Sequence, residues 1–210
     1  PYTIDTFLPW DFTSDGDRYV ISNVYECLFE YDANTCIPVL AESYTNPDDC
    51  TWDVKIRENA YWHTGNKLFG DEKVQIKAED VKWVMDWTMD PANGSKQQTN
   101  LSSVVSSVEV LDDFTLRFTT PEPKALFLFT LSRVMVFPKK AIDEGFDLNA
   151  WPVGSGAFKY VSYQTDDQVV LEKNSDYYIT PNVDEVIFKI IPDKSVSAIA
   201  LQNGEIDITA

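Results

Sequence analysis

The stretch Thr51-Trp52-Asp53-Val54-Lys55-Ile56-Arg57 alternates strictly between apolar and polar side chains. In an extended chain the apolar members share one face, which is the pattern of a half-buried β-strand: Trp52, Val54 and Ile56. The preceding segment Asn46-Pro47-Asp48-Asp49 has turn-forming residues, and residues 41–45 supply a partner strand. We therefore predict a β-hairpin here, with Trp52 in the core.

Helical periodicity occurs on both sides of this hairpin. Residues 17–28 place an apolar side chain at every fourth position, and Ser14-Asp15-Gly16 just before them supplies start signals. Residues 78–89 show the same spacing and stop at Asp90-Pro91, because a residue that precedes proline is disfavoured in a helix. We predict one helix in each segment.

The rest of the chain interleaves strand and helix patterns. We predict strands at residues 107–111, 115–119, 158–163, 169–173, 186–191 and 205–208. We predict a short helix at residues 138–145 and a helix at residues 196–203 capped by Ser195, whereas periodicity leaves residues 125–131 undecided between helix and strand. Interspersed elements with frequent hairpins favour an α/β (mixed α+β) fold over a sandwich or a bundle. The chain stops on a newly begun strand, so we expect a parent protein that continues beyond it.

Composition excludes several classes of protein. With 44% hydrophobic and 24% charged residues, the chain has the make-up of a folded globular protein and not of a disordered one. The formal net charge of -17 repels phosphate, so we expect no nucleic-acid partner and no anionic membrane surface. No apolar stretch is long enough to span a bilayer, and Pro1-Tyr2-Thr3-Ile4-Asp5 lacks the basic and apolar regions of a signal peptide. That leaves open a signal in the parent gene.

Cysteine and histidine are too few for most metal sites. The chain has three cysteines, Cys27, Cys36 and Cys50, and one histidine, His63. None of the cysteines forms a CxxC pair, so we expect no zinc site and no other metal site. We expect free, inert thiols, and a bridge between Cys36 and Cys50 stays open as the alternative.

No constellation for catalysis stands out. A nucleophile with a histidine base has to use His63, which we interpret as a turn histidine that is hydrogen-bonded locally. Among 34 acidic residues no spacing singles out a catalytic pair. The glycines of Val153-Gly154-Ser155-Gly156-Ala157-Phe158 lead into a strand and not into a helix, so this turn is not a phosphate loop. We expect no catalytic residue and no cofactor.

Aromatic residues in loops are the better candidates for contacting a ligand. Trp10 and Trp151 lie beside prolines in predicted loops, whereas Trp83 and Trp87 share one face of a predicted helix and suit packing. The turn around Gly154 permits a close backbone approach, either for packing or beside a ligand.

Four stretches of the chain carry recognisable motifs: Ser22–Asp32; Pro38–Tyr44 followed by Thr51–Gly65 and Ala78–Val81; Pro152–Phe158; and Asn174–Tyr178 with Ile191–Asp193 and Ala200–Asp207. Together they resemble the dipeptide/oligopeptide (peptide/nickel) branch of the extracellular solute-binding proteins of ABC transporters. They are similar to the family patterns N-x-Y-E-G-L-x-x-Y-D, P-x-L-A-E-S-W with A-E-D-V, P-V-G-T-G-P-F, and N-P-D-Y-W with A-L-x-x-G-E-I-D. The chain departs from them at Cys27 and Thr64, where the family has glycine and aspartate, and in a longer loop at residues 67–75.

The resemblance implies a two-lobed protein of roughly twice this length. Residues 1–210 then form most of the first lobe, a periplasmic-binding-protein-like lobe of type II with a mixed β-sheet flanked by helices. Residues 35–150 are expected as an inserted β-hairpin and helix subdomain. The second lobe, expected to hold the acidic group that faces a peptide's amino group, lies outside this chain.

The resemblance also assigns ligand contacts and a function. The loop of Phe12, Thr13, Ser14 and Asp15 is expected to meet an extended ligand through main-chain groups, with Trp10, Trp151 and Gly154 as further candidates by position. The implied function is capture of di- or oligopeptides for an ABC permease by a monomer in the periplasm or anchored outside the membrane through a lipid. The alternatives are a nickel chelate, haem, an oligosaccharide or an opine as cargo, or a sensory ligand-binding module without transport.

Overall fold

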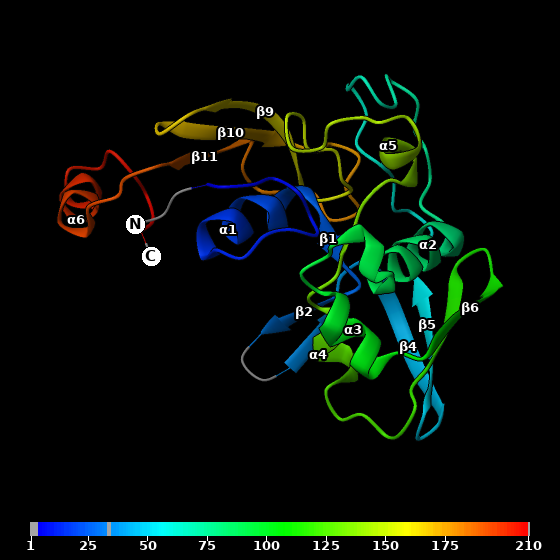
Figure 1. The fold of residues 1–210 in the computed structure, drawn as a ribbon. Helices are drawn as coiled ribbons and strands as arrows, with labels where there is room; N and C mark the ends of the chain where they lie inside the picture. Colours follow the sequence, from blue (N-terminus) through cyan, green and yellow to red (C-terminus); the bar gives the residue numbers. More distant parts are fainter. Residues whose placement is uncertain (1–3, 33–34, 210) are drawn as a thin grey trace.

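The computed structural model describes residues 4–32 and 35–209, which form a mixed α+β chain (Figure 1). Its helices are α1 (Asp15–Val24), α2 (Ala78–Met89), the 3-10 helix η1 (Pro91–Asn93), α3 (Gln98–Val104), α4 (Phe127–Leu131), α5 (Lys139–Asp143) and α6 (Lys194–Gln202). Its strands are β1 (Glu26–Cys27), β2 (Phe29–Asp32), β3 (Thr35–Pro38), β4 (Ala41–Asp48), β5 (Thr51–Ile56), β6 (Ser107–Asp112), β7 (Thr115–Thr119), β8 (Met135–Val136), β9 (Phe158–Gln164), β10 (Gln168–Lys173) and β11 (Glu185–Lys189). The predicted mixed α+β class is confirmed.

The described strands form four separate sheets. The largest has the order β4-β5-β7-β6, another has the order β11-β10-β9, and two pairs join β1 with β8 and β2 with β3. Every pairing among these strands is antiparallel. The expected mixed sheet is therefore not what the described residues form, because most of these strands are joined by short turns, and a hairpin pairs strands antiparallel.

The four-stranded sheet and α2 enclose one part of the core. Val54 and Ile56 of β5 are fully buried, as are Val81 and Val84 on the facing side of α2. The bounds of α2 agree with the prediction, and the helix ends before Pro91 for the predicted reason. Trp52 is half-buried and stacks on the ring of Phe127, with 4.6 Å between ring centroids, so it packs at the border of the core.

The three-stranded sheet packs on the other side of the chain, beside α1 (Figure 1). Val169 and Leu171 of β10 are fully buried, and α1 buries Val20, Ile21 and Val24. The predicted strands at residues 158–163, 169–173 and 186–191 correspond to β9, β10 and β11. This sheet and α1 position the segments around the glycine turn of residues 153–158.

Helix α1 is shorter than predicted. It ends at Val24, because Tyr25 is extended (φ -109°, ψ 153°) and Glu26–Cys27 pair with Met135–Val136. Leu28 is nevertheless fully buried. The prediction that the helix continues to Leu28 is wrong. Leu28 lies four residues after Val24 and is buried, but a buried residue just beyond a helix gives the same spacing as one within it.

The turn of the first hairpin also lies later than predicted. β4 runs to Asp48, which pairs with Thr51, so the turn is Asp49-Cys50. Pro47 is tolerated within β4 because the register shifts between Thr45 and Asp48 and because β4 is an edge strand.

The C-terminal elements differ from the prediction in two ways. Asp193, and not Ser195, caps α6, because the Asp193 carboxylate accepts hydrogen bonds from the N–H groups of Ser195 (2.7 Å) and Val196 (3.1 Å). Residues 205–208 form no strand. The undecided run at residues 125–131 contains helix α4.

All three cysteines are free in the part of the chain that the structure describes. Cys36 lies in β3 and Cys50 in the turn at the far end of β4, so an extended strand separates the two residues. Burial raises the pKa of the Cys27 thiol to about 12, which keeps that thiol protonated and unreactive.

Candidate functional site

The loop before α1 is anchored at its start by a buried carboxylate. Asp17 is fully buried, and its Oδ1 accepts hydrogen bonds from the N–H groups of Asp5 (2.7 Å) and Thr6 (3.3 Å). The side chain of Asn149 holds the next residue, because its Oδ1 accepts a hydrogen bond from the Phe7 N–H at 2.8 Å. These contacts fix where residues 8–14 begin.

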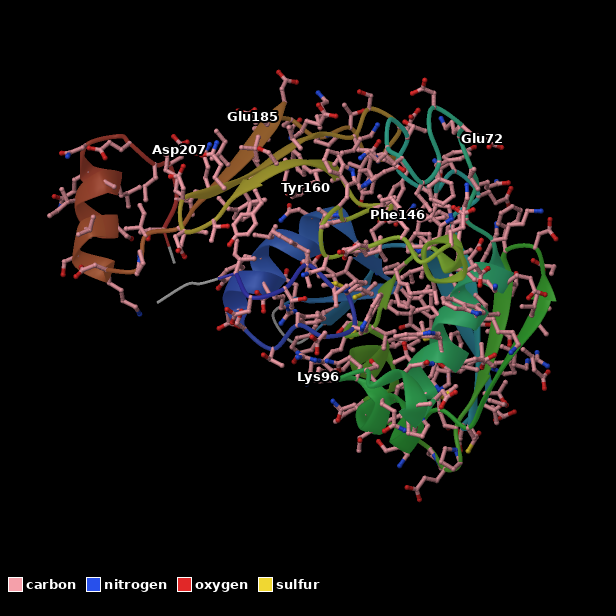
Figure 2. The ribbon with its side chains drawn as sticks, turned by 45° about the horizontal axis from the view of Figure 1, so that its top comes forward. Glu72, Lys96, Phe146, Tyr160, Glu185 and Asp207 are labelled. Carbon is pink, nitrogen blue, oxygen red and sulfur yellow. The ribbon has the colours of Figure 1, made fainter. Side chains whose placement is uncertain are left out.

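A second anchor holds the middle of this loop against the helices. The Trp10 ring packs on Trp87 and Phe137, with centroid distances of 4.9 Å and 4.7 Å. The Trp10 carbonyl accepts a hydrogen bond from the Lys96 N–H at 2.9 Å; Lys96 is labelled in Figure 2. Trp10 also lines a small hollow together with the buried polar residues Thr88, Ser95 and Gln97.

The segment between the anchors and the helix leaves main-chain groups unpaired. Among the described residues, no hydrogen-bond partner is found for the main-chain N–H and C=O groups of Phe12 and Thr13. The Phe12 ring is buried, Thr13 and Asp15 are exposed, and the Ser14 Oγ accepts the Asp17 N–H at 3.0 Å as the predicted cap of α1. A rigidly held loop with free main-chain groups is suited to pair with an extended chain.

The glycine turn packs against the other end of α1. A Cβ on Gly154 would lie 2.1 Å from the Val24 carbonyl oxygen, and a Cβ on Gly156 would lie 2.4 Å from the Asn23 carbonyl oxygen. The Gly156 N–H donates to the Val24 carbonyl at 2.8 Å. Both positions therefore need glycine for packing. Gly154 is buried here.

His63 is a buried residue whose ring partners are far away in the sequence. Its Nδ1 accepts the Gly154 N–H at 3.4 Å, so its Nε2 carries the proton and donates to the Gly156 carbonyl at 2.9 Å. Burial lowers the pKa of His63 to about 4, although the hydrogen bond to Gly156 opposes this shift. The interpretation of His63 as structural is confirmed. Its carbonyl does accept a local hydrogen bond from the Asn66 side chain, whereas the partners of its ring are remote. Neither ring nitrogen is left to act as a base.

The seven candidate residues do not form one cluster. Trp10, Phe12, Thr13, Ser14 and Asp15 lie together at the start of α1, whereas Gly154 lies against its last turn, roughly 15 Å away at 1.5 Å per residue. Trp151 is 37% exposed and packs edge-on against Tyr160 of β9, labelled in Figure 2, with 5.2 Å between centroids.

Sequence reasoning missed a buried polar cluster around Glu26. Its carboxyl group accepts hydrogen bonds from the hydroxyls of Ser155 (2.7 Å), Tyr177 (3.1 Å) and Tyr178. Burial raises the pKa of Glu26 to about 7, against the lowering effect of these hydroxyls and of Arg57. The available signal was an acidic residue inside the apolar run Val24-Tyr25-Glu26-Cys27-Leu28-Phe29.

Other candidate sites are weak. A hollow of about 230 Å³ is lined by Trp62, Phe69, Glu72, Val74, Asp80, Pro138, Lys139 and Lys140, none of them a predicted ligand residue. Residues 4–32 and 35–209 hold no group of three or more His, Cys, Asp or Glu side chains placed to bind a metal ion. Over the same residues, no helix is long and apolar enough to cross a membrane.

Residues 35–210 match a family model described as "Bacterial extracellular solute-binding proteins, family 5 Middle". The chain belongs to this family. The family is one of solute-binding proteins, in agreement with the expectation that this chain is not an enzyme.

Individual relatives agree with this assignment. The glutathione-binding protein GsiB of Pectobacterium atrosepticum is 29% identical over 97% of this chain and 39% of its own length. The periplasmic binding protein DppA of Helicobacter pylori, solved with the peptide STSA, superposes with a TM-score of 0.86 at 29% identity over 98% of this chain and 44% of its own. NikZ of Campylobacter jejuni, solved with Ni(L-His), gives a TM-score of 0.82 at 28% identity over 97% of this chain and 40% of its own. The chain thus spans about two fifths of these relatives.

Proposed function

We propose that the protein carrying this chain captures a di- or oligopeptide outside the membrane and delivers it to an ABC permease. The observation that carries the peptide part is the anchored loop at Phe12 and Thr13, whose main-chain groups are unpaired among the described residues. Such groups pair with the backbone that every peptide has, whatever its side chains. Family membership and the peptide-bound relative support this cargo.

We further propose that residues 1–210 form most of the first lobe of a two-lobed, type II clamshell. Residues 35–150 then form an inserted subdomain, built here on the four-stranded sheet and α2, while α1 and β9–β11 belong to the body of the lobe. A second lobe supplies the opposite wall of the cleft. A ligand loses most of its surface only when both walls are present, so this chain alone should bind weakly.

The primary ligand contacts in this proposal are Phe12, Thr13, Ser14 and Asp15. Trp10 lines the base of the loop, and the exposed Trp151 is a peripheral contact. Gly154 acts indirectly, because its packing against Val24 holds the far end of α1. The protein works as a monomer, either in the periplasm or held at the outer face of the membrane by a lipid anchor.

Calorimetry on the full-length protein tests the role of the main chain. Thr13→Pro removes one N–H from the loop, whereas the matched control Thr13→Ala changes the side chain and keeps the main chain. We expect Thr13→Pro to weaken peptide binding by roughly fivefold and Thr13→Ala to bind like the wild type, because a lost hydrogen bond is worth about 1 kcal/mol. Melting curves of both variants check that they fold.

Two outcomes contradict the proposal. Equal binding by Thr13→Pro and wild type excludes ligand pairing through the Thr13 N–H. A full-length protein that binds glutathione or a nickel–histidine chelate but no other peptide keeps the scaffold and replaces the cargo. These are the ligands in the names of the two other relatives.

A further inference from the structure

The Glu26 carboxyl group joins segments that are far apart in the sequence. Glu26 lies in β1, Ser155 in the glycine turn, and Tyr177 and Tyr178 in the loop after β10. The Tyr178 hydroxyl also reaches the Val39 carbonyl oxygen at 2.9 Å, between β3 and β4. One buried cluster therefore ties β1, the glycine turn and the loop after β10 to the start of the proposed inserted subdomain.

Arg57 closes this cluster from the side of β5. Its Nε donates to the Val39 carbonyl oxygen at 2.6 Å, and its guanidinium carbon lies 4.4 Å from the centre of the Tyr178 ring. The structure shows no direct ion pair between Arg57 and Glu26. The guanidinium attracts the carboxyl group at a distance but does not neutralise it by contact.

The hydroxyl groups around Glu26 carry too few protons for all of these contacts when Glu26 is ionised. Ser155, Tyr177 and Tyr178 bring three hydroxyl protons to five close oxygen–oxygen contacts. If Glu26 is ionised, the single Tyr178 proton must serve both the Glu26 carboxylate and the Val39 carbonyl. One of these two contacts then brings two acceptors together, which is unfavourable in a buried site.

A proton on Glu26 removes this conflict. The carboxyl group then donates to the Tyr178 oxygen, and Tyr178 donates its own proton to the Val39 carbonyl. Ser155 still donates to the other carboxyl oxygen, and Tyr177 still donates to the Glu26 carboxyl group. The arrangement therefore suits a neutral acid, which also avoids burying a charge.

We propose that Glu26 is a proton-dependent tie between the body of the lobe and residues 39–57. Protonated Glu26 holds these two parts firmly together, and ionised Glu26 loosens their contact. The charged and titratable groups around it are Arg57 on the β5 side, Tyr177 and Tyr178 on the β10 side, and Cys27 beside it on β1. Burial raises the pKa of both tyrosines and of Cys27, so these three stay neutral through neutral pH. His63 contacts the glycine turn at Gly154 and Gly156 and is neutral above about pH 4.

Hydrogen exchange in the full-length protein tests the tie directly. Glu26→Gln is the matched variant, because its amide stays neutral at every pH and offers a donor to Tyr178. In the wild type, once exchange rates are corrected for the intrinsic effect of pH, we expect protection of residues 26–28, 154–157 and 174–178 to fall as pH rises from 6 to 8. We expect roughly a tenfold loss that levels off above about pH 7, because the raised pKa of Glu26 is then passed, and no such loss in Glu26→Gln.

Infrared difference spectra detect the protonation of Glu26 itself, which would not change with pH in this range if Glu26 had only a packing role. Between pH 6 and 8 the wild type should lose the carbonyl band of one protonated carboxyl group, and Glu26→Gln should lack this change. Ser155→Ala removes a donor that stabilises the ionised form, so it should move the midpoint to higher pH. The proposal is overturned if Glu26→Gln keeps the wild-type pH dependence, or if the midpoint stays near the ordinary value for glutamate. Neither outcome depends on which solute the protein binds.

Discussion

His63 shows how a single buried side chain couples folding to pH. In the folded chain both of its ring nitrogens are used by the glycine turn, and there is no room for a second proton. The unfolded chain takes up that proton below its ordinary pKa of 6.5, whereas the folded chain resists protonation down to about pH 4. Its contribution to stability is therefore present above pH 6.5 and is lost as pH falls toward 4.

We predict that His63→Gln reduces this acid destabilisation. Between pH 6.5 and 4 the wild type should lose about 3 kcal/mol more unfolding free energy than the variant, because the shift of the His63 pKa corresponds to about that much. Urea unfolding of both proteins at several pH values measures the difference. Glu26 also titrates in part of this range, but it is present in both proteins, so its contribution cancels in the difference between their unfolding free energies. Parallel curves would contradict the role assigned to His63.

Gly154 and Gly156 are required by close packing and not by a special backbone angle. We predict that Gly154→Ala lowers the free energy of unfolding by roughly 3 kcal/mol or more, because its Cβ would meet the Val24 backbone at 2.1 Å. Gly70→Ala is a control: it has positive φ (58°) but nothing within 4 Å of its Cβ, so it should cost only about 1 kcal/mol. Denaturant curves that rank the two variants equally would contradict the packing argument.

At the scale of elements, α1 connects the loop at one end to the glycine turn at the other. Its start depends on Ser14, and its last turn rests on Gly154 and Gly156. A change at either end of the helix should therefore alter where the loop of residues 12–15 points.

We predict that Ser14→Ala costs about 1 kcal/mol of unfolding free energy, because the Asp17 N–H loses its side-chain acceptor. Ser22→Ala, at an exposed position within the same helix, should change stability by less than about 0.5 kcal/mol. Thermal unfolding compares the two. A Ser22→Ala variant as unstable as Ser14→Ala would show that the cap is not the cause.

At the scale of the whole molecule, the end that carries α6 has apolar side chains in solvent. Val196 and Ile199 of α6 are each 54% exposed, and Ile187 of β11 is 45% exposed. α6 stands apart from the four-stranded sheet (Figure 1). Asp207 lies at the end of the molecule that carries α6, and Glu72 lies at the other end (Figure 2). Few protein atoms cover this apolar surface in the described residues.

We predict that the 210-residue chain binds a fluorescent dye for apolar surfaces at this end. Replacing Val196 and Ile199 together by serine should lower dye binding, with little change in stability, because both side chains are exposed. Leu126→Ser, which alters an even more exposed apolar side chain beside α4, should leave binding at this end unchanged. Equal dye binding by the double variant and the wild type would place the apolar surface elsewhere.

Local patterns were sufficient for several elements. The bounds of α2, the face of β5 and the cap at Ser14 follow from spacing, from Pro91 and from one hydroxyl group. These features depend on residues a few positions apart, so the amino-acid sequence determined them without the rest of the fold. The family resemblance likewise rested on short motifs, which the match over residues 35–210 confirmed.

Tertiary structure decided the features that join distant segments. The end of α1 at Val24 depends on the pairing of β1 with β8, whereas the partners of His63 and the cluster at Glu26 depend on the glycine turn. All of these partners lie some 90 to 130 residues away along the chain. Spacing within one segment holds no information about which remote backbone group will lie beside a buried side chain. The amino-acid sequence therefore determined the elements and the family, and only the packed chain determined which polar groups share a proton.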